Sequence, residues 1–300
     1  MSEVALKESK LNKILQSETW YNYKHSWTAK IGSFLIISIV LIAIIGPLFV
    51  PQNPYNLADL ALEDAYLPPV WEDGGRAPFL LGTDQQGRDI LSAIVYGSRV
   101  SLFIGIVGTL LASTFGISMG LLSGYFGGRV DSIIMRIADV QLSFPSLLIA
   151  LFLMSLIGQG VVNILIALLL VGWVRYARTV RGATLSVIQN EYIEATKVIG
   201  LSNLRVIVKH VLPNVLTSII VLSTIQVGGF ILTEATLSFL GMGVPITRPS
   251  LGMLCSNGFS VLYSGLWWVS IFPGLYIMMI VFGINLMGDF LRDEFNPKLK

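Results

Sequence analysis

Residues 31–50, with the sequence IGSFLIISIVLIAIIGPLFV, contain no charged side chain. A helix rises about 1.5 Å per residue, so a run of this length crosses the roughly 30 Å hydrocarbon core of a bilayer. The whole 300-residue chain has the same character: 54% of its residues are hydrophobic and 13% are charged, against about 25% charged residues in an ordinary soluble domain. This run is therefore predicted to be the first helix of an all-α integral membrane protein.

Five more apolar windows follow the first one. They cover residues 100–122, 140–157, 161–174, 211–233 and 267–286. Counting each window as one crossing predicts six transmembrane helices. The fourth window is short and lies close to the third, so a re-entrant pair is the alternative to two full crossings at that point.

The distribution of charge predicts the orientation. Lysine and arginine gather in residues 1–30 and 175–209, whereas residues 51–97 contain seven acidic residues against Arg76 and Arg88. Because cytoplasmic loops carry the excess of basic residues, a multi-pass protein of the cytoplasmic membrane with both termini inside is expected. The predicted organisation is a cytoplasmic segment (1–30), a first helix (31–50), an extracytoplasmic loop (51–97), a core with five helices (98–290) and a cytoplasmic tail (291–300). The outer loop is rich in turn formers and is expected to fold as a small cap.

Residues 191–213 form a polar passage in an otherwise apolar region. The pattern predicts a short helix over 191–198 that ends at Gly200, because only glycine adopts the left-handed cap conformation without steric cost. Ser202 or Asn203 is then expected to cap a second helix. The predicted product is a helical hairpin on the cytoplasmic face, which is either a solvated connector or a structure that another protein grips.

Prolines are expected to distort three helices. Pro145 and Pro273 lie in the third and sixth windows, where a bend gives either simple shape or a gate. Pro213 is expected to bend the chain where the hairpin enters the fifth window, since proline lacks an N–H and its ring clashes with the preceding turn.

A few charged side chains fall at membrane depth, where each costs several kcal/mol unless it is paired or hydrated. Glu234 lies near the outer end of the fifth window and is expected either to line a path or to anchor an interface with a partner. Arg136 and Asp139 are three residues apart near the inner end of the third window and are expected to form a structural ion pair.

Small residues mark one face of the second predicted helix. They are Gly116, Gly120 and Gly124. Their four-residue spacing lets a neighbouring backbone approach closely, so helix packing is expected here rather than contact with a substrate.

Several functional classes are disfavoured by what the sequence lacks. The single Cys255 excludes an intrachain disulfide, and His25 and His210 form no recognisable metal-ligand spacing. A net charge of +2 gives no field for nucleic acid. The chain has no G-x-x-x-x-G-K-[ST] motif, so any ATP-driven work has to come from another subunit.

Residues 194–213, EATKVIGLSNLRVIVKHVLP, resemble the EAA loop of permease subunits in ATP-binding-cassette (ABC) importers. The match includes Glu194, Ala195, Gly200 and the final Leu-Pro pair that ends at Pro213. The sequence departs from the motif at Thr196 and His210. Neither change disturbs the helix-turn-helix pattern.

More specific blocks extend the resemblance to residues 81–299. They are LGTDQQGRDILSAIVYGSRVSL, GYFGGRVDSIIMRIADVQLSFP, HVLPNV, EATLSFLGMGV and NLMGDFLRDEFNPKL. Together they are similar to the dipeptide, oligopeptide and nickel permease family, in its C-type subunit, although Asn296 and Leu251 replace an expected Asp and Trp.

This resemblance implies an ABC importer type I permease fold and a chain that is not an enzyme. In that family a second, B-type permease completes the translocation path, two ATPases bind ATP and Mg²⁺, and an extracytoplasmic protein delivers the substrate. This chain is then expected to bind no cofactor or metal of its own, and Glu234, Pro145 and Pro273 fall along the path or at the permease interface. The residues expected to couple to an ATPase are Glu191, Glu194, Ala195, Gly200, Leu201, Arg205 and Pro213.

Short peptides are the expected substrate, and nickel or another small solute is the alternative. A proton-coupled secondary transporter is a rival interpretation. It would show a relay of intramembrane acids or histidines and often a repeated half, and the sequence shows neither clearly. A membrane-embedded enzyme would need a convergent catalytic set, which the scattered charges do not supply.

Overall fold

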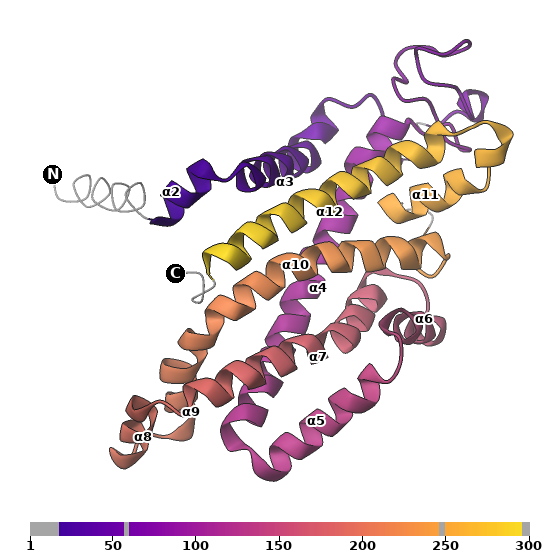
Figure 1. Cartoon of the computed structure of the whole chain (residues 1–300). Helices are drawn as coiled ribbons and strands as arrows, with labels where there is room; N and C mark the ends of the chain where they lie inside the picture. Colours follow the sequence, from indigo (N-terminus) through magenta and orange to yellow (C-terminus); the bar gives the residue numbers. More distant parts are fainter. Residues whose placement is uncertain (1–17, 57–59, 246–249, 296–300) are drawn as a thin grey trace.

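Long apolar helices make up most of the computed structural model, which describes residues 18–56, 60–245 and 250–295 (Figure 1). Five helical stretches are long and apolar enough to cross a membrane. Three of them are single helices: α4 (Ile90–Phe126), α7 (Val161–Val187) and α12 (Trp268–Glu294). One consists of α3 (Trp27–Ile45) and the 3₁₀ turn η1 (Gly46–Leu48). The last joins α9 (Asn203–Val206), the π-helical turn η4 (Ile207–Val211) and α10 (Leu212–Phe239) in one continuous stretch.

The remaining described elements are shorter. They are α2 (Glu18–His25), η3 (Leu62–Asp64), α5 (Gly128–Leu142), α6 (Ser146–Ile157), α8 (Glu191–Val198), α11 (Leu251–Phe259) and η5 (Leu262–Ser264). Apart from one isolated bridge, the described residues contain no β-structure. The predicted all-helical class is confirmed, whereas residues 1–17 of the predicted N-terminal segment and 296–300 of the tail lie outside the described residues.

The third predicted membrane helix is broken. Its window, 140–157, straddles the junction of α5 and α6, which are bent by 90° relative to each other. Pro145 precedes α6, and a proline pushes the residue before it out of the helical region and offers no N–H. The structure therefore has five unbroken candidate spans, and the predicted sixth is present if the bent pair forms one span.

Two other boundaries differ from the hydropathy windows. The loop that is predicted to be extracytoplasmic ends at Asp89 rather than at residue 97, because α4 begins at Ile90. The fourth window ends at residue 174, whereas α7 continues to Val187. Hydropathy reports how apolar a segment is, so helical turns with serine or arginine side chains fall outside the windows.

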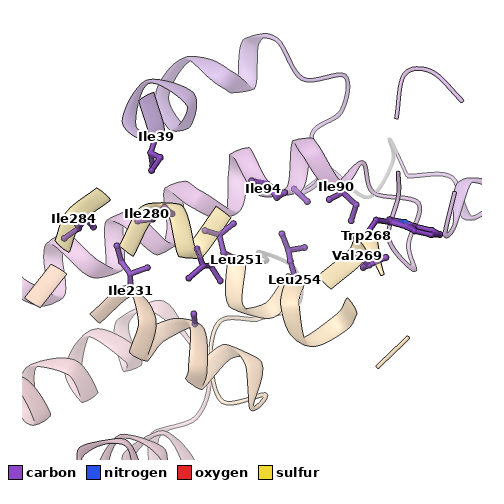
Figure 2. Packing of buried hydrophobic residues seen from close by; sticks show 13 residues of the cluster. Ile39, Ile90, Ile94, Ile231, Leu251, Leu254, Trp268, Val269, Ile280 and Ile284 are labelled. Carbon is purple, nitrogen blue, oxygen red and sulfur yellow. The ribbon is translucent and has the colours of Figure 1, made fainter. Parts of the chain in front are cut away.

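The largest apolar core forms where five helices meet (Figure 2). Its buried members include Ile39 of α3, Ile90 of α4, Ile231 of α10, Leu254 of α11 and Ile280 of α12. The sequence windows missed α11 because its nine residues are too few to span a bilayer. Its burial against α10 and α12 makes it part of the folded bundle.

The loop between α3 and α4 folds against the start of α12. The Trp268 indole donates to the Thr83 carbonyl at 3.3 Å, and the Trp267 indole donates to the Glu72 carboxylate at 3.1 Å. Asp84 accepts two backbone N–H groups at 2.8 and 3.0 Å, yet burial raises the pKa of this carboxyl above its usual range. The described part of the loop thus forms a cap at the end of the bundle opposite α8 and α9 (Figure 1).

Asp89 is a buried helix cap whose removal should destabilise the chain. Its Oδ2 accepts the backbone N–H of Ser92 at 2.8 Å and the Ser92 hydroxyl at 2.5 Å, at the start of α4. Asp89→Ala leaves both donors buried and unpaired, so we expect the free energy of unfolding to fall by about 1–3 kcal/mol. Thermal unfolding of the purified chain in detergent measures this. Asp89→Asn keeps an acceptor and should lose less; equal melting temperatures for Asp89→Ala and the wild type would contradict the prediction.

Candidate functional site

The polar passage after α7 forms the predicted helical hairpin. Its first helix, α8, covers Glu191–Val198 as predicted, and Gly200 has φ of +82°, in the left-handed region. The Leu201 N–H donates to the Thr196 carbonyl at 3.1 Å and closes the end of the helix. The predicted stop at Gly200 is confirmed. Ser202 precedes α9, but its side chain makes no capping hydrogen bond.

One face of the hairpin is anchored on the C-terminal ends of α4 and α7. Ile193 is fully buried in an apolar cluster that also contains Leu121 of α4 and Val180 of α7. The Tyr125 hydroxyl, near the end of α4, donates to Asn203 Oδ1 at 3.0 Å. These contacts fix the hairpin to the membrane helices rather than leaving it as a free connector.

The opposite face of the hairpin is apolar and uncovered. Val198, Ile199 and Leu204 are 88%, 76% and 72% exposed. Exposed charged and small residues flank them, namely Glu191, Glu194, Ala195 and Arg205. A cluster of large exposed apolar side chains within a polar rim is typical of a protein interaction surface. Leu201 was expected on that surface, but it is half-buried and packs against the anchoring cluster.

The second arm of the hairpin continues into the membrane without interruption, from Asn203 to Phe239. Pro213 is the second residue of α10 but lies inside this continuous stretch, where it offers no N–H to the helical ladder. The π-helical turn Ile207–Val211 comes shortly before it. Such turns are local widenings inside helices and often occur at functional sites. A distortion is expected from Pro213, and the helix departs from α-helical geometry two residues before it, in this π-helical turn.

The glycine face of α4 packs on α7, as the spacing predicted. A Cβ at Gly116 would meet the Trp173 carbonyl oxygen at 2.5 Å, and one at Gly124 would meet Thr184 Cβ at 2.7 Å. Of all helix pairs in the described chain, α4 and α7 share the most extensive contact. Helix packing, not substrate contact, is the role of this face in the structure.

Glu234 lies inside the chain. Its side chain is 0% exposed and accepts the Ser101 hydroxyl of α4 at 2.8 Å and the Ser238 hydroxyl at 2.7 Å. Both roles expected for Glu234, lining a path and anchoring a partner, need an exposed carboxylate. In this structure the side chain instead joins α10 to α4.

The predicted ion pair between Arg136 and Asp139 is wrong. Asp139 pairs with Arg178 of α7. Side chains on a helix lean toward its N-terminus, so an arginine that precedes an aspartate by three residues leans away from it. A second bridge between the same helices joins Asp131 to Arg181, with Nη2 and Oδ2 2.6 Å apart.

The two remaining predicted residues lie in different surroundings. Pro145 is exposed at the break between α5 and α6, whereas Pro273 is buried inside α12. Within the described residues, no group of three or more His, Cys, Asp or Glu side chains is placed to hold a metal ion.

Comparison with known proteins matches almost the whole chain. Residues 90–300 match the family described as binding-protein-dependent transport system inner membrane component. The chain belongs to this permease family. Residues 15–69 also match the N-terminal transmembrane domain of oligopeptide transport permease C. The resemblance found in the sequence motifs is confirmed.

Two similar proteins are permeases of peptide transport systems. The dipeptide transport system permease protein DppC of Haemophilus influenzae is 40% identical over 283 residues, which cover 94% of this permease and 95% of the relative. The oligopeptide transport system permease protein OppC of Bacillus subtilis is 37% identical over 296 residues, covering 99% and 94%.

A solved structure shares the fold. One chain of the inward-facing MetNI methionine ABC transporter aligns with a TM-score of 0.54 at 19% identity, covering 68% of this permease and 96% of that chain. The permease therefore has the fold of an ABC transporter membrane subunit, and its family is a transport family rather than a catalytic one.

Proposed function

We propose that this chain is one of two different permease subunits in an ATP-driven importer of short peptides. The second is a related B-type permease, two ATPases bind ATP and Mg²⁺, and an extracytoplasmic protein delivers the peptide. The names of the dipeptide and oligopeptide relatives support peptides over nickel as the substrate.

The observation that carries this proposal is the two-faced hairpin. One face is buried on α4 and α7, and the other presents Val198, Ile199 and Leu204 to the surroundings. A connector that served only to join two helices would not expose large apolar side chains. The exposed face fits a cleft on an ATPase, and Glu194 and Arg205 at its edge supply charges of both signs.

The continuity of the second arm provides the coupling. The hairpin turn leads directly into the helix that runs from Asn203 to Phe239, so a push on the hairpin tilts that helix as one body. The buried cluster with Leu121 and Val180 carries the same motion to α4 and α7. Closure of the ATPases can thereby change the side of the membrane to which the translocation path opens.

The orientation follows from this assignment. If the hairpin meets ATPases, it lies in the cytoplasm, and with the bent α5–α6 pair counted as the sixth span both termini of the chain do too. The loop between α3 and α4 then faces the outside, where its ordered fold on α12 suits it to receive the binding protein.

Purification of the tagged chain in mild detergent from its native membrane tests the assembly. We expect mass spectrometry to identify a second permease and two P-loop ATPases, and reconstituted vesicles to accumulate a labelled dipeptide only with ATP and the binding protein. A chain that purifies alone and drives uptake from an ion gradient would overturn the proposal. Uptake of nickel instead of peptide would keep the architecture and change the substrate.

A further inference from the structure

A cavity of about 330 Å³ lies where the α5–α6 break faces α7 and α10. Its walls include Phe144 and Leu147 near the break, Arg175 of α7, and Gln226 and Thr233 of α10. This volume falls within the range of about 300–1,000 Å³ typical of small-molecule sites. The hairpin and the buried Glu234 play no part in it.

Arg175 is the only charged side chain among the residues that line the cavity. Its Nη1 donates to Gln226 Oε1 at 3.0 Å, and Gln226 is itself only 8% exposed. An arginine among membrane-spanning helices is costly unless its charge is paired or hydrated, so arginines in such places often mark a substrate path.

No carboxylate of the described chain forms an ion pair with Arg175. Acidic side chains of α5 and α10 have other partners. Asp139 of α5 pairs with Arg178, and Glu234 of α10 accepts hydrogen bonds from hydroxyl groups on the side of the helix that faces α4. A guanidinium has five N–H donors, and the hydrogen bond to Gln226 uses one of them. The cavity therefore presents a positive group whose countercharge the described chain does not supply.

The wall that carries Arg175 is held firmly. Gln141, at the end of α5, donates to the Val171 carbonyl at 3.1 Å and accepts the Trp173 indole N–H at 2.9 Å. These two bonds tie the helix before the break to the turn of α7 that precedes Arg175. The Arg175 side chain itself is exposed, and its hydrogen bond to Gln226 orients the guanidinium at the cavity.

We propose that Arg175, steadied by Gln226, binds the terminal carboxylate of a peptide as it crosses the permease. This rests on the proposed function, because it names a site on the route that such a substrate takes. The planar fork of arginine matches a carboxylate through two parallel hydrogen bonds. The hydroxyls of Ser146 and Thr233 offer partners for peptide groups, and the apolar walls tolerate different side chains.

The sign of the charge also defines the class of solute. A permanent cation attracts a carboxylate-bearing solute and repels a free divalent metal ion. The cavity therefore favours peptides with a free C-terminus over both C-terminal amides and bare nickel.

The test compares uptake of labelled dialanine with uptake of dialanine amide by the reconstituted complex. In Arg175→Gln we expect the ratio of acid to amide uptake to fall about tenfold relative to the wild type, since a charge-assisted contact to only one of the two solutes is lost. The binding protein is the same in both complexes, so its own selectivity cancels in this comparison. Gln226→Glu supplies a countercharge within the chain and should lower the ratio similarly while it keeps Arg175.

Arg178→Gln is the matched control, because it removes the same charge one turn further along α7, outside the cavity wall. Its ratio should equal that of the wild type. Equal losses of acid and amide uptake in Arg175→Gln and Gln226→Glu would overturn the inference and leave the proposed function intact. A wild-type complex that takes up neither peptide would overturn the proposed function, and this inference with it.

Discussion

Gly120→Leu should prevent α4 and α7 from packing and leave little folded permease. A Cβ at Gly120 would meet the Ala177 carbonyl oxygen at 2.6 Å and Val180 Cβ at 2.7 Å, and the remaining atoms of leucine need further space. Overpacking of this kind costs about 1–3 kcal/mol, and more where backbone atoms block relaxation. We expect a large loss of purified chain and a lower melting temperature in detergent.

Gly182→Leu is the control for this experiment. Gly182 belongs to α7, and a Cβ there meets no atom within 4 Å. Both substitutions place leucine in a helix, so they share any gain in helix propensity, and only the clash with the neighbouring helix differs. Equal melting temperatures for the two variants would show that the close approach of α4 to α7 is not needed.

The second large effect is expected at the hairpin turn, where Gly200→Val should uncouple ATP from transport. Gly200 has φ of +82°, which a β-branched residue rarely adopts. The cost of about 1–2 kcal/mol would shift the turn away from its docked shape and weaken docking by about tenfold. We expect ATP-driven uptake to fall accordingly, measured in vesicles that contain the whole complex.

Gly200→Asn separates conformation from packing in this test. A Cβ at Gly200 meets no atom within 4 Å in this chain, so neither side chain clashes with the described residues. Asparagine tolerates the left-handed region far better than valine and should retain most of the uptake. Unchanged uptake in Gly200→Val would refute the assignment of this turn to coupling, and equal loss in both variants would point to a steric contact with a partner instead.

The predictions that succeeded depend on features within a single stretch of chain. A charge-free run predicts a membrane helix because its length matches the bilayer, and the glycine spacing on α4 predicts a packing face because it follows the helical period. The bounds of α8 and the conformation of Gly200 are equally local. Hydropathy alone left the hairpin open between a connector and a docking surface, and the family motifs favour the docking surface that is proposed above.

The predictions that failed depend on which helix lies beside which. The predicted partner of Asp139, Arg136, lies on the same helix, but the arginine that pairs with Asp139 comes from α7. Glu234 lies near the outer end of an apolar window as expected, and the structure buries it against Ser101 of α4. The sequence likewise places Arg175 just after a window, as one more basic residue of a loop, whereas the structure sets it in the wall of a cavity beside Gln226.

The sequence by itself thus determined a membrane protein of long helices, a hairpin between two of them and the permease family to which the chain belongs. Periodicity, length and glycine conformation act between residues close in the chain, so a single sequence reveals them. Pro145 already indicated a bend in the third window, whereas only the tertiary structure decided the partners of the charged side chains and the cavity at Arg175. Those features arise from contacts between segments far apart in the sequence, and the packing of the whole bundle selects them.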